Sequence, residues 1–274
     1  MQSNLSNLSL HLALSGPPCQ PYLTEGLGLG DADIRCCLDD VVATINEIRP
    51  KLFIVENVAS LLNAPHKSTW HRVRGALLNM KDDSGRPAYR VRCKLLNSYC
   101  FGVPQCRSRV YIVGVRADTA SRSFKFPSTV PKPRLGEFLQ NCMRNHPEPS
   151  SLTPTNLKNI AHSEGMMRTV NVDPRSAWAI IDVGTGRPGK LRPFHQYHCP
   201  CITKTRARAG DFYCTRLQRK LDNSEMAALQ GFRPGEVDFG SLTRNQVGAL
   251  IGNAMTVPVL ESLLREGLAV IGAL

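Results

Sequence analysis

A cysteine set between prolines is the first residue of the chain with an evident chemical use. The stretch "SGPPCQPY" follows a short apolar run and places Cys19 in a stiff, polar turn. Cysteine reacts as a nucleophile through its thiolate, and nearby cations lower the thiol pKa from about 8.5. Because most cysteines in such turns are inert, Cys19 by itself is only a candidate nucleophile.

Glu56 is the second candidate, and it directly follows the apolar run 51–55, "KLFIV". That run predicts a fully buried strand of the parallel type. A carboxylate at such a place is costly unless it has partners or a chemical role. The alternative is a structural carboxylate that binds loop amides.

Three polar side chains alternate in "QCRSR", just before or within another predicted strand. A period of two predicts that Gln105, Arg107 and Arg109 lie on one face. Two guanidinium groups on one face suit a phosphate or a base that carries a carbonyl. The alternative is an exposed edge strand with solvated arginines.

The elements that must position these residues follow from hydrophobic periodicity. The predicted order is a strand at 10–14, a helix at 38–48 that Pro50 ends, a strand at 51–55, a helix from a Ser68 cap to Met80, and strands at 89–96 and 109–116. This order is typical of parallel α/β proteins, whose chemistry gathers beyond the C-terminal ends of the strands. Cys19 and Glu56 are both predicted just past a strand end.

The rest of the chain contains two parts that differ in composition and in hydrophobic periodicity. Residues 117–198 are rich in Pro, Ser, Asn, His and Arg and show weak periodicity, which indicates a separate small module. Helical patterns return at 222–229, where Asp222 and Glu225 have capping-box spacing, and again at 243–251 and 260–270.

Composition narrows the class of protein. The 274 residues carry a formal net charge of +12, which favours a polyanionic partner such as nucleic acid. The ten cysteines are irregularly spaced and the N-terminus lacks the features of a secretory signal, so we expect reduced thiols and an intracellular protein, nuclear if the source is eukaryotic. No apolar run approaches the roughly 20 residues of a membrane helix, so no membrane partner is expected.

Five stretches in order, "GPPCQPY", "FIVENV", "VPQCRSRVYIVGVR", "LDNSEMAALQGF" and "IGNAMTVPV", strongly resemble the cytosine-5 DNA methyltransferases. The resemblance implies an α/β fold with a Rossmann-like sheet of the S-adenosylmethionine-dependent methyltransferase type and a small, irregular target-recognition domain. By this resemblance, 1–116 and 199–274 form the catalytic domain and 117–198 the target-recognition region.

The resemblance also implies a mechanism on double-stranded DNA. The cytosine is flipped into the pocket, Cys19 adds to its C6, and Glu56 hydrogen-bonds N3. The methyl group of S-adenosylmethionine goes to C5, and loss of the C5 proton and of the thiol releases the product. Arg109 corresponds to an arginine near the cytosine O2, and Arg107 to its partner toward the backbone or the catalytic loop.

The remaining site residues are implied by the same resemblance. The Pro18 backbone and Asn253 are expected to contact the cofactor, while Gln20, Asn57 and Gln105 are expected near the DNA substrate. No metal is expected, because the spacing in "HQYHCPC" at His195 is too tight and no second cluster accompanies it.

One departure concerns the N-terminal cofactor-binding motifs of the family. Only 18 residues precede Cys19, so the glycine-rich loop and the acidic strand end that hold the cofactor are not found upstream. We expect an N-terminally truncated sheet, and three explanations stay open. The chain is a fragment or a mispredicted gene model, which we favour; a partner chain supplies the missing strands; or the chain is a degenerate paralogue.

Three other functions are weighed against DNA methylation. "CPCITK" partly matches the signature of the tRNA-modifying branch, so an RNA cytosine-5 methyltransferase is the nearest alternative. An inactive paralogue that only binds DNA also agrees with the charge. A cysteine hydrolase would need a histidine base near Cys19, and His66 and His71 are the candidates.

Overall fold

The computed structural model describes residues 11–18, 20–22, 29–33, 35–142, 151–184 and 193–274. The chain divides into two compact units. The first contains Met1–Leu96, Ser108–Ser128 and Leu260–Leu274, and the second contains Asn97–Arg107 and Thr129–Val259. The functional division at residues 116 and 198 stays a prediction.

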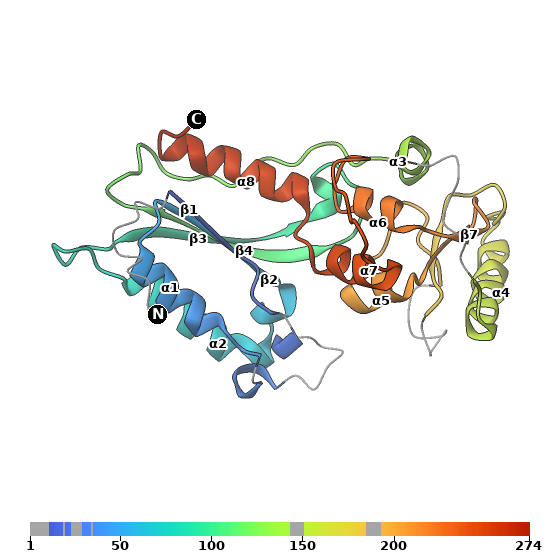
Figure 1. Cartoon of the computed structure of the whole chain (residues 1–274), viewed down its shortest axis with the longest axis horizontal. Coiled ribbons are helices and arrows are strands. Elements are labelled where there is room, and N and C mark those ends of the chain that lie inside the picture. The colour runs from blue at the N-terminus through green and yellow to red at the C-terminus, as the bar shows by residue number, and fades with distance from the viewer. Residues whose placement is uncertain (1–10, 19, 23–28, 34, 143–150, 185–192) are drawn as a thin grey trace. The chain divides into compact units, whose positions relative to one another are not determined.

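A four-stranded sheet forms the centre of the first unit, in the order β1-β2-β4-β3 (Figure 1). Its strands are β1 (Leu12–Ser15), β2 (Leu52–Val58), β3 (Tyr89–Asn97) and β4 (Ser108–Arg116). β1 runs parallel to β2, whereas β4 runs antiparallel to β2. The expectation of a parallel sheet therefore holds for β1 and β2 only, and the sheet as a whole is mixed.

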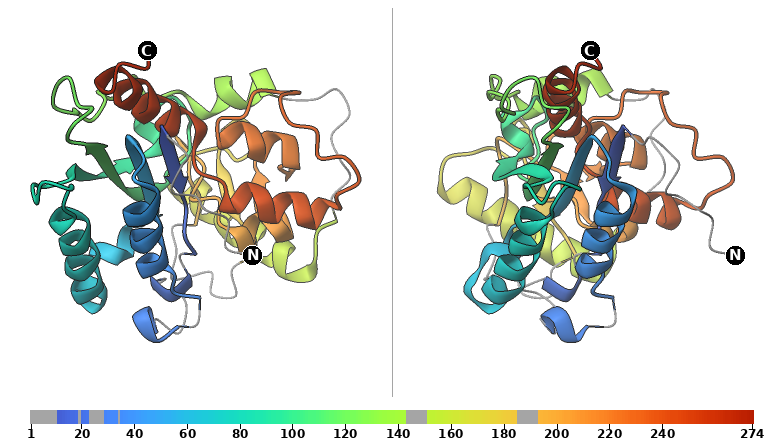
Figure 2. Two further views of the ribbon diagram at one scale, coloured as in Figure 1. Left: turned by 60° about the vertical axis from the view of Figure 1, so that its left-hand side comes forward. Right: turned by 90° about the vertical axis from the view of Figure 1, so that its left-hand side faces the viewer.

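Helices cover both faces of this sheet. α1 (Leu38–Ile48) and α2 (Lys67–Asn79) lie on one face and α8 (Val257–Val270) on the other, as Figures 1 and 2 show. Gly267 lets α8 approach closely, because a Cβ at this position would stand 2.6 Å from Leu52 Cδ2. The core against α1 and α2 includes Tyr22, Leu38, Ile45, Phe53, Val55, Trp70, Val73, Leu77, Val110 and Ile112.

The ends of α1 follow from local sequence, whereas the start of α2 does not. Asp39 and Asp40 lie in the first turn of α1, where negative charge is favourable. Arg49 ends the helix in the left-handed conformation with φ of 45°, just before Pro50. The predicted Ser68 cap is wrong, because α2 begins at Lys67 and the preceding His66 makes no capping hydrogen bond.

β2 is longer than its apolar run predicts. All seven residues from Leu52 to Val58 are buried, so Glu56 lies inside the strand rather than just past its end. The cause is tertiary: β4 continues the pairing beyond the apolar run, as far as Val58 opposite Arg109. The six elements from β1 to β4 otherwise occur in the predicted order.

The second unit contains a small antiparallel sheet and several helices. The sheet order is β5-β6-β7, from Ile180–Asp182, Phe212–Cys214 and Arg219–Lys220. The helices are α3 (Leu135–Cys142), α4 (Pro154–Thr169), α5 (Lys204–Ala209), α6 (Asn223–Leu229) and α7 (Arg244–Asn253). The core includes Leu135, Leu139, Ile180, Ile202, Phe212, Met226, Leu229, Val247 and Ile251.

Two predicted features of this unit are confirmed. Asp222 and Glu225 form a capping box at the start of α6, each side chain accepting a hydrogen bond from the other residue's backbone N–H. The helix predicted at 243–251 is α7. Glycines let α7 touch α5 backbone to backbone, since a Cβ at Gly252 would lie 2.5 Å from Lys204 Cα.

Candidate active site

Glu56 and Arg109 form an ion pair in the first unit. Arg109 Nε lies 3.1 Å from Glu56 Oε1, and the two side chains are 12% and 10% exposed. Glu56 stands opposite Tyr111 and Arg109 opposite Val58, so the pair is a diagonal neighbour on one face of β2 and β4. The arginine therefore compensates and orients the carboxylate whose burial the sequence makes costly.

β1 brings the chain to the same end of the sheet. Its last residue, Ser15, pairs in parallel with Val55, the residue before Glu56. Cys19 follows Ser15 by four residues and lies outside the described residues. Pro17 is buried and Pro18 exposed, so the Pro-Pro turn is anchored on one side. Parallel pairing thus directs the chain that leaves Ser15 toward the C-terminal end of β2, near Glu56.

Tyr22 fixes the chain just after Cys19. The short 3-10 helix Gln20–Tyr22 ends at this tyrosine, whose side chain is wholly buried. Its carbonyl accepts a hydrogen bond from Ser60 Oγ at 2.5 Å, and its ring meets His66 edge to face at 5.2 Å. This anchoring of Tyr22 is a positioning element that the sequence reasoning missed.

A polar cluster surrounds the Tyr22 hydroxyl. The hydroxyl oxygen lies 2.9 Å from Cys36 Sγ, and the hydroxyl donates a hydrogen bond to Asp31 Oδ1 at 3.4 Å. The other carboxylate oxygen, Asp31 Oδ2, accepts a hydrogen bond from Thr69 and forms an ion pair with Arg72 at 3.0 Å. Burial raises the pKa of Tyr22, and the hydrogen bond with Cys36 raises it further. Burial would also raise the pKa of Asp31, but the hydrogen bonds from Arg72 and Thr69 outweigh it and lower that pKa.

Asn57 is fully buried beside Glu56 in β2. Its Oδ1 accepts a hydrogen bond from the backbone N–H of Val58 at 2.8 Å. Nothing in the described part of the chain accepts from its Nδ2, which is buried. A buried donor without a partner is costly, so Asn57 is a polar group with hydrogen-bonding capacity left at the site.

Gln105 and Arg107 precede β4, whereas Arg109 lies within it. β4 begins only at Ser108, so the predicted alternation fails and both residues belong to the second unit. Arg107 is buried and donates to the carbonyl oxygens of Ile202, Gly252 and Ala254 at 2.9, 3.3 and 2.9 Å. These contacts are structural, and the expected role of Arg107 toward the backbone or the catalytic loop stays a prediction.

Gln105 organises the second unit from a fully buried position. Its Nε2 donates to Leu229 O at 2.8 Å and Gln230 Oε1 at 3.0 Å, and its Oε1 accepts from Ile202 N at 3.1 Å. These are structural contacts, and a role of Gln105 toward DNA stays a prediction.

Gln230 and Thr256 connect three of the sequence motifs, and the sequence reasoning missed both. Gln230 Nε2 donates to Ile251 O at 2.8 Å, and Thr256 Oγ1 donates to Gln230 Oε1 at 3.3 Å. Thr256 also lies 2.7 Å from Ser98 Oγ. The sequence signal available was the position of Gln230 and Thr256 inside two of the five motifs.

These arrangements agree with a family comparison that covers nearly the whole chain. Residues 2–268 match the model of the C-5 cytosine-specific DNA methylases. The chain belongs to this family. The family match thus confirms the resemblance drawn from the five motifs.

Known methylases are similar in sequence and in structure. The Type II methyltransferase M.NgoBI of Neisseria gonorrhoeae is 32% identical over 92% of this chain and 72% of its own length. M1.HphI of Haemophilus parahaemolyticus is 27% identical over 96% of this chain and 70% of its own. The solved Entamoeba histolytica methyltransferase EhMeth has a TM-score of 0.60 at 17% identity, covering 97% of this chain and 81% of its own, which shows a shared fold.

The two residues predicted to contact the cofactor of this methylase fall in different units. Pro18 belongs to the first unit and Asn253, exposed at the end of α7, to the second. A main-chain carbonyl and a side-chain amide suit the amino and carboxyl groups of a methionine moiety. Each group by itself is of a type that suits S-adenosylmethionine, and the contacts of Pro18 and Asn253 with this cofactor stay a prediction.

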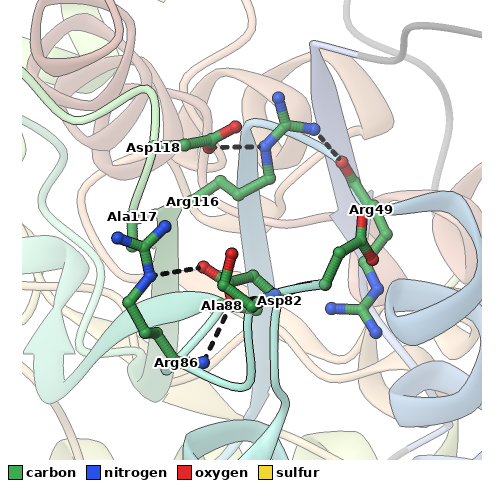
Figure 3. Close-up of a pocket in the computed structure, with 9 residues that line it drawn as sticks. Arg49, Asp82, Arg86, Ala88, Arg116, Ala117 and Asp118 are labelled. Carbon is green, nitrogen blue, oxygen red and sulfur yellow. Dashed lines mark hydrogen bonds and ion pairs between the residues drawn. The ribbon is translucent and has the colours of Figure 1, made fainter.

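A charged cavity of about 410 Å³ lies at the opposite ends of the strands from Glu56, beyond Leu52 and Val115 (Figure 3). Arg116 pairs with Asp118 at 2.8 Å and donates to Arg49 O at 2.7 Å, while Arg86 pairs with Asp82. Because these charges neutralise one another, the cavity is held together by internal ion pairs rather than prepared for one charged ligand.

The described ranges also show how metal-ligating side chains, cysteines and apolar helices are distributed. No group of three or more metal-ligating side chains occurs in these ranges, and the nine cysteines that they contain are free thiols. No single described helix is long and apolar enough to cross a membrane; α7 and α8 pass that test only as a bent pair.

Proposed function

We propose that this methylase transfers a methyl group from S-adenosylmethionine to C5 of cytosine in double-stranded DNA, through a covalent adduct of Cys19. The observation that carries the proposal is the Glu56–Arg109 pair at the strand end to which β1 leads. The pair holds a buried, oriented carboxylate next to Val55, and β1 pairs with Val55 through its last residue, Ser15, which supports an approach of the following turn to this carboxylate. The positive charge of the chain agrees with a DNA partner.

Each residue then has a defined task. The Cys19 thiolate adds to C6 of the flipped cytosine, and the electron pair of the C5–C6 bond makes C5 nucleophilic. Glu56 holds a proton at N3 and stabilises the charge that develops on the ring. Arg109, already at the carboxylate, meets the cytosine O2. S-adenosylmethionine supplies the methyl group when bound.

Release of the product restores the thiol. Loss of the C5 proton and expulsion of Cys19 re-form the aromatic ring. Pro17 and the anchored Tyr22 hold the chain on either side of Cys19, which favours a fixed line of attack, since small misplacements of a nucleophile are expensive. Asn57 and Gln20 stay candidates for contacts with the DNA, and 117–198 for target recognition.

Transfer of a labelled methyl group to oligonucleotides tests the proposal. We expect transfer to duplex DNA, and a loss of about 10²- to 10⁴-fold in rate for Glu56→Gln. Glu47→Gln is the matched control, because Glu47 is exposed on α1. Transfer to RNA but not to duplex DNA would assign the chain to the RNA alternative. DNA binding without transfer to either substrate would leave a DNA-binding paralogue.

A further inference from the structure

A second cavity, of about 310 Å³, lies entirely within the second unit. The mechanism above uses none of its residues. It is lined by Tyr99, Lys132, Arg134, Gly136, Trp178 and Tyr197, together with Pro133, Leu135 and Gln196. The lining thus combines three aromatic rings with two cations and contains no carboxylate. Its volume is near the lower end of the range for ligand pockets, about 300 Å³, which suits one small flat group.

Gly136 determines where the Trp178 indole can lie. A Cβ on residue 136 would stand 2.5 Å from Trp178 Cδ1 and 2.7 Å from Cγ. Only glycine therefore lets the indole pack directly against the backbone at the start of α3. The ring is held as part of the cavity wall, and it stays partly exposed.

The other two rings differ in how they are held. Tyr99 meets the His198 ring edge to face at 5.3 Å, and Lys132 Nζ lies over the Tyr99 ring at 5.3 Å. Tyr197 is 70% exposed, so most of its ring surface is open to solvent. One aromatic face at the cavity is therefore available to a ligand.

The charges around the cavity are mainly positive. Lys132 and Arg134 are both exposed, and among the described residues the carboxylate that pairs with them is Glu137, 3.2 Å from Arg134 on the surface. Exposed ion pairs of this type are weak, so a phosphate group can replace the carboxylate of Glu137 as the partner of Arg134. Aromatic faces beside cations are the features by which proteins bind the bases and phosphates of single-stranded nucleic acid.

We propose that this cavity holds one unpaired base of a nucleic-acid strand, at a site separate from the cytosine that is methylated. The base stacks on Tyr197 and Trp178, and Lys132 and Arg134 meet the flanking phosphates. A paired base is excluded, because its two faces are covered by its neighbours in the duplex. This inference rests on the proposed function only in that the partner is a nucleic acid.

Fluorescence anisotropy with labelled oligonucleotides tests this site on the full chain. The probes are a 12-nucleotide single-stranded DNA, an RNA of the same sequence, and the DNA duplex. We expect Tyr197→Ala to weaken single-strand binding about 5- to 100-fold, from the usual contribution of one stacked base. Tyr197→Phe keeps the ring and should stay within about 2-fold of the wild type. The duplex should bind both variants equally.

Salt dependence separates stacking from charge. Tyr197→Ala should lower the affinity for the single strand without changing the slope of log K against log salt, whereas Lys132→Ala should reduce the magnitude of that slope by about 0.7. Lys158→Ala is the matched control, since Lys158 is exposed on α4 away from the cavity lining. Gly136→Ala should give the same loss as Tyr197→Ala by displacing the indole, with thermal melting as the check on folding.

The outcomes decide the proposal independently of the reaction. No measurable single-strand binding, an unchanged affinity in Tyr197→Ala, or equal losses on single strand and duplex would overturn it. Comparison of the DNA and RNA probes shows which strand the cavity prefers. If the wild type binds single strands through Tyr197 but transfers no methyl group, the cavity stands and the proposed function fails.

Discussion

Arg109 Nε and Glu56 Oε1 lie 3.1 Å apart across two antiparallel strands, with both side chains largely buried. The pair is diagonal in register, so it forms only if β4 lies beside β2 as far as Val58. Two motifs that are 53 residues apart in sequence are thereby joined at one strand end. This pairing brings the carboxylate and the guanidinium group of the candidate site into contact.

Removal of Arg109 should destabilise the first unit. Arg109→Leu leaves the Glu56 carboxylate buried without its cation, which typically costs about 3–5 kcal/mol in the free energy of unfolding. Urea unfolding measures the loss. The double variant with Glu56→Leu should recover a good part of it, since no uncompensated charge then stays buried. A double variant as unstable as the sum of the two single variants would show that the two side chains are not coupled.

Asp31 should make stability depend on pH. Its folded pKa lies below that of an unfolded aspartate, about 3.9, so its stabilisation is present above about pH 4 and is lost as the pH falls through the lowered value. The difference in unfolding free energy between the wild type and Asp31→Asn should therefore shrink in acid. Thr69→Val, which removes one hydrogen bond to Asp31, should weaken this dependence. A constant difference across that range would contradict the assignment.

Arg107 should stabilise the second unit through its hydrogen bonds to main-chain carbonyl groups. Arg107→Lys keeps the charge, but a single ammonium cannot reproduce the fork that reaches Ile202, Gly252 and Ala254. We expect a loss of about 1–3 kcal/mol in stability from the unsatisfied carbonyl groups. Arg208→Lys, at an exposed position of α5, should have little effect on unfolding by urea. Equal stability of both variants would rule out the structural role.

Gly114 should tolerate no side chain. A Cβ at this position would stand 2.1 Å from Phe53 Cε1, its partner across β2 and β4. Gly114→Ala should cost about 1–3 kcal/mol through overpacking of the core, and Phe53→Leu in the same chain should restore part of it. Gly75→Ala is the contrasting control, because nothing lies within 4 Å of its Cβ and alanine favours the helix interior. Thermal unfolding of the three variants compares them directly.

The sequence predicted elements whose signals are local. α1 could be predicted from apolar spacing and Pro50, and the Asp222–Glu225 cap from residue types three apart. Glu56 could not be placed inside β2, because pairing with β4 extends the strand beyond its apolar run. The alternation of Gln105, Arg107 and Arg109 was misleading for another reason, since β4 begins only at Ser108.

In the candidate site, too, the sequence predicted residues but not the contacts between them. The motifs predicted Glu56 and Arg109 as site residues, but their pairing depends on a strand register that no local pattern encodes. Tyr22 and Thr69 were not singled out, since their hydrogen bonds to Asp31 join positions 9 and 38 residues apart. Gly136 could not be related to Trp178 without the packing of the second unit.

The most direct test of the central claim is covalent capture on 5-fluorocytosine. The chain is mixed with labelled S-adenosylmethionine and a duplex that carries the fluorinated base, whose fluorine cannot leave as a proton does. We predict a shifted, labelled band on a denaturing gel that is absent for Cys19→Ser and kept by Cys36→Ser. A band that survives Cys19→Ser, or no band although the duplex binds, would contradict the account.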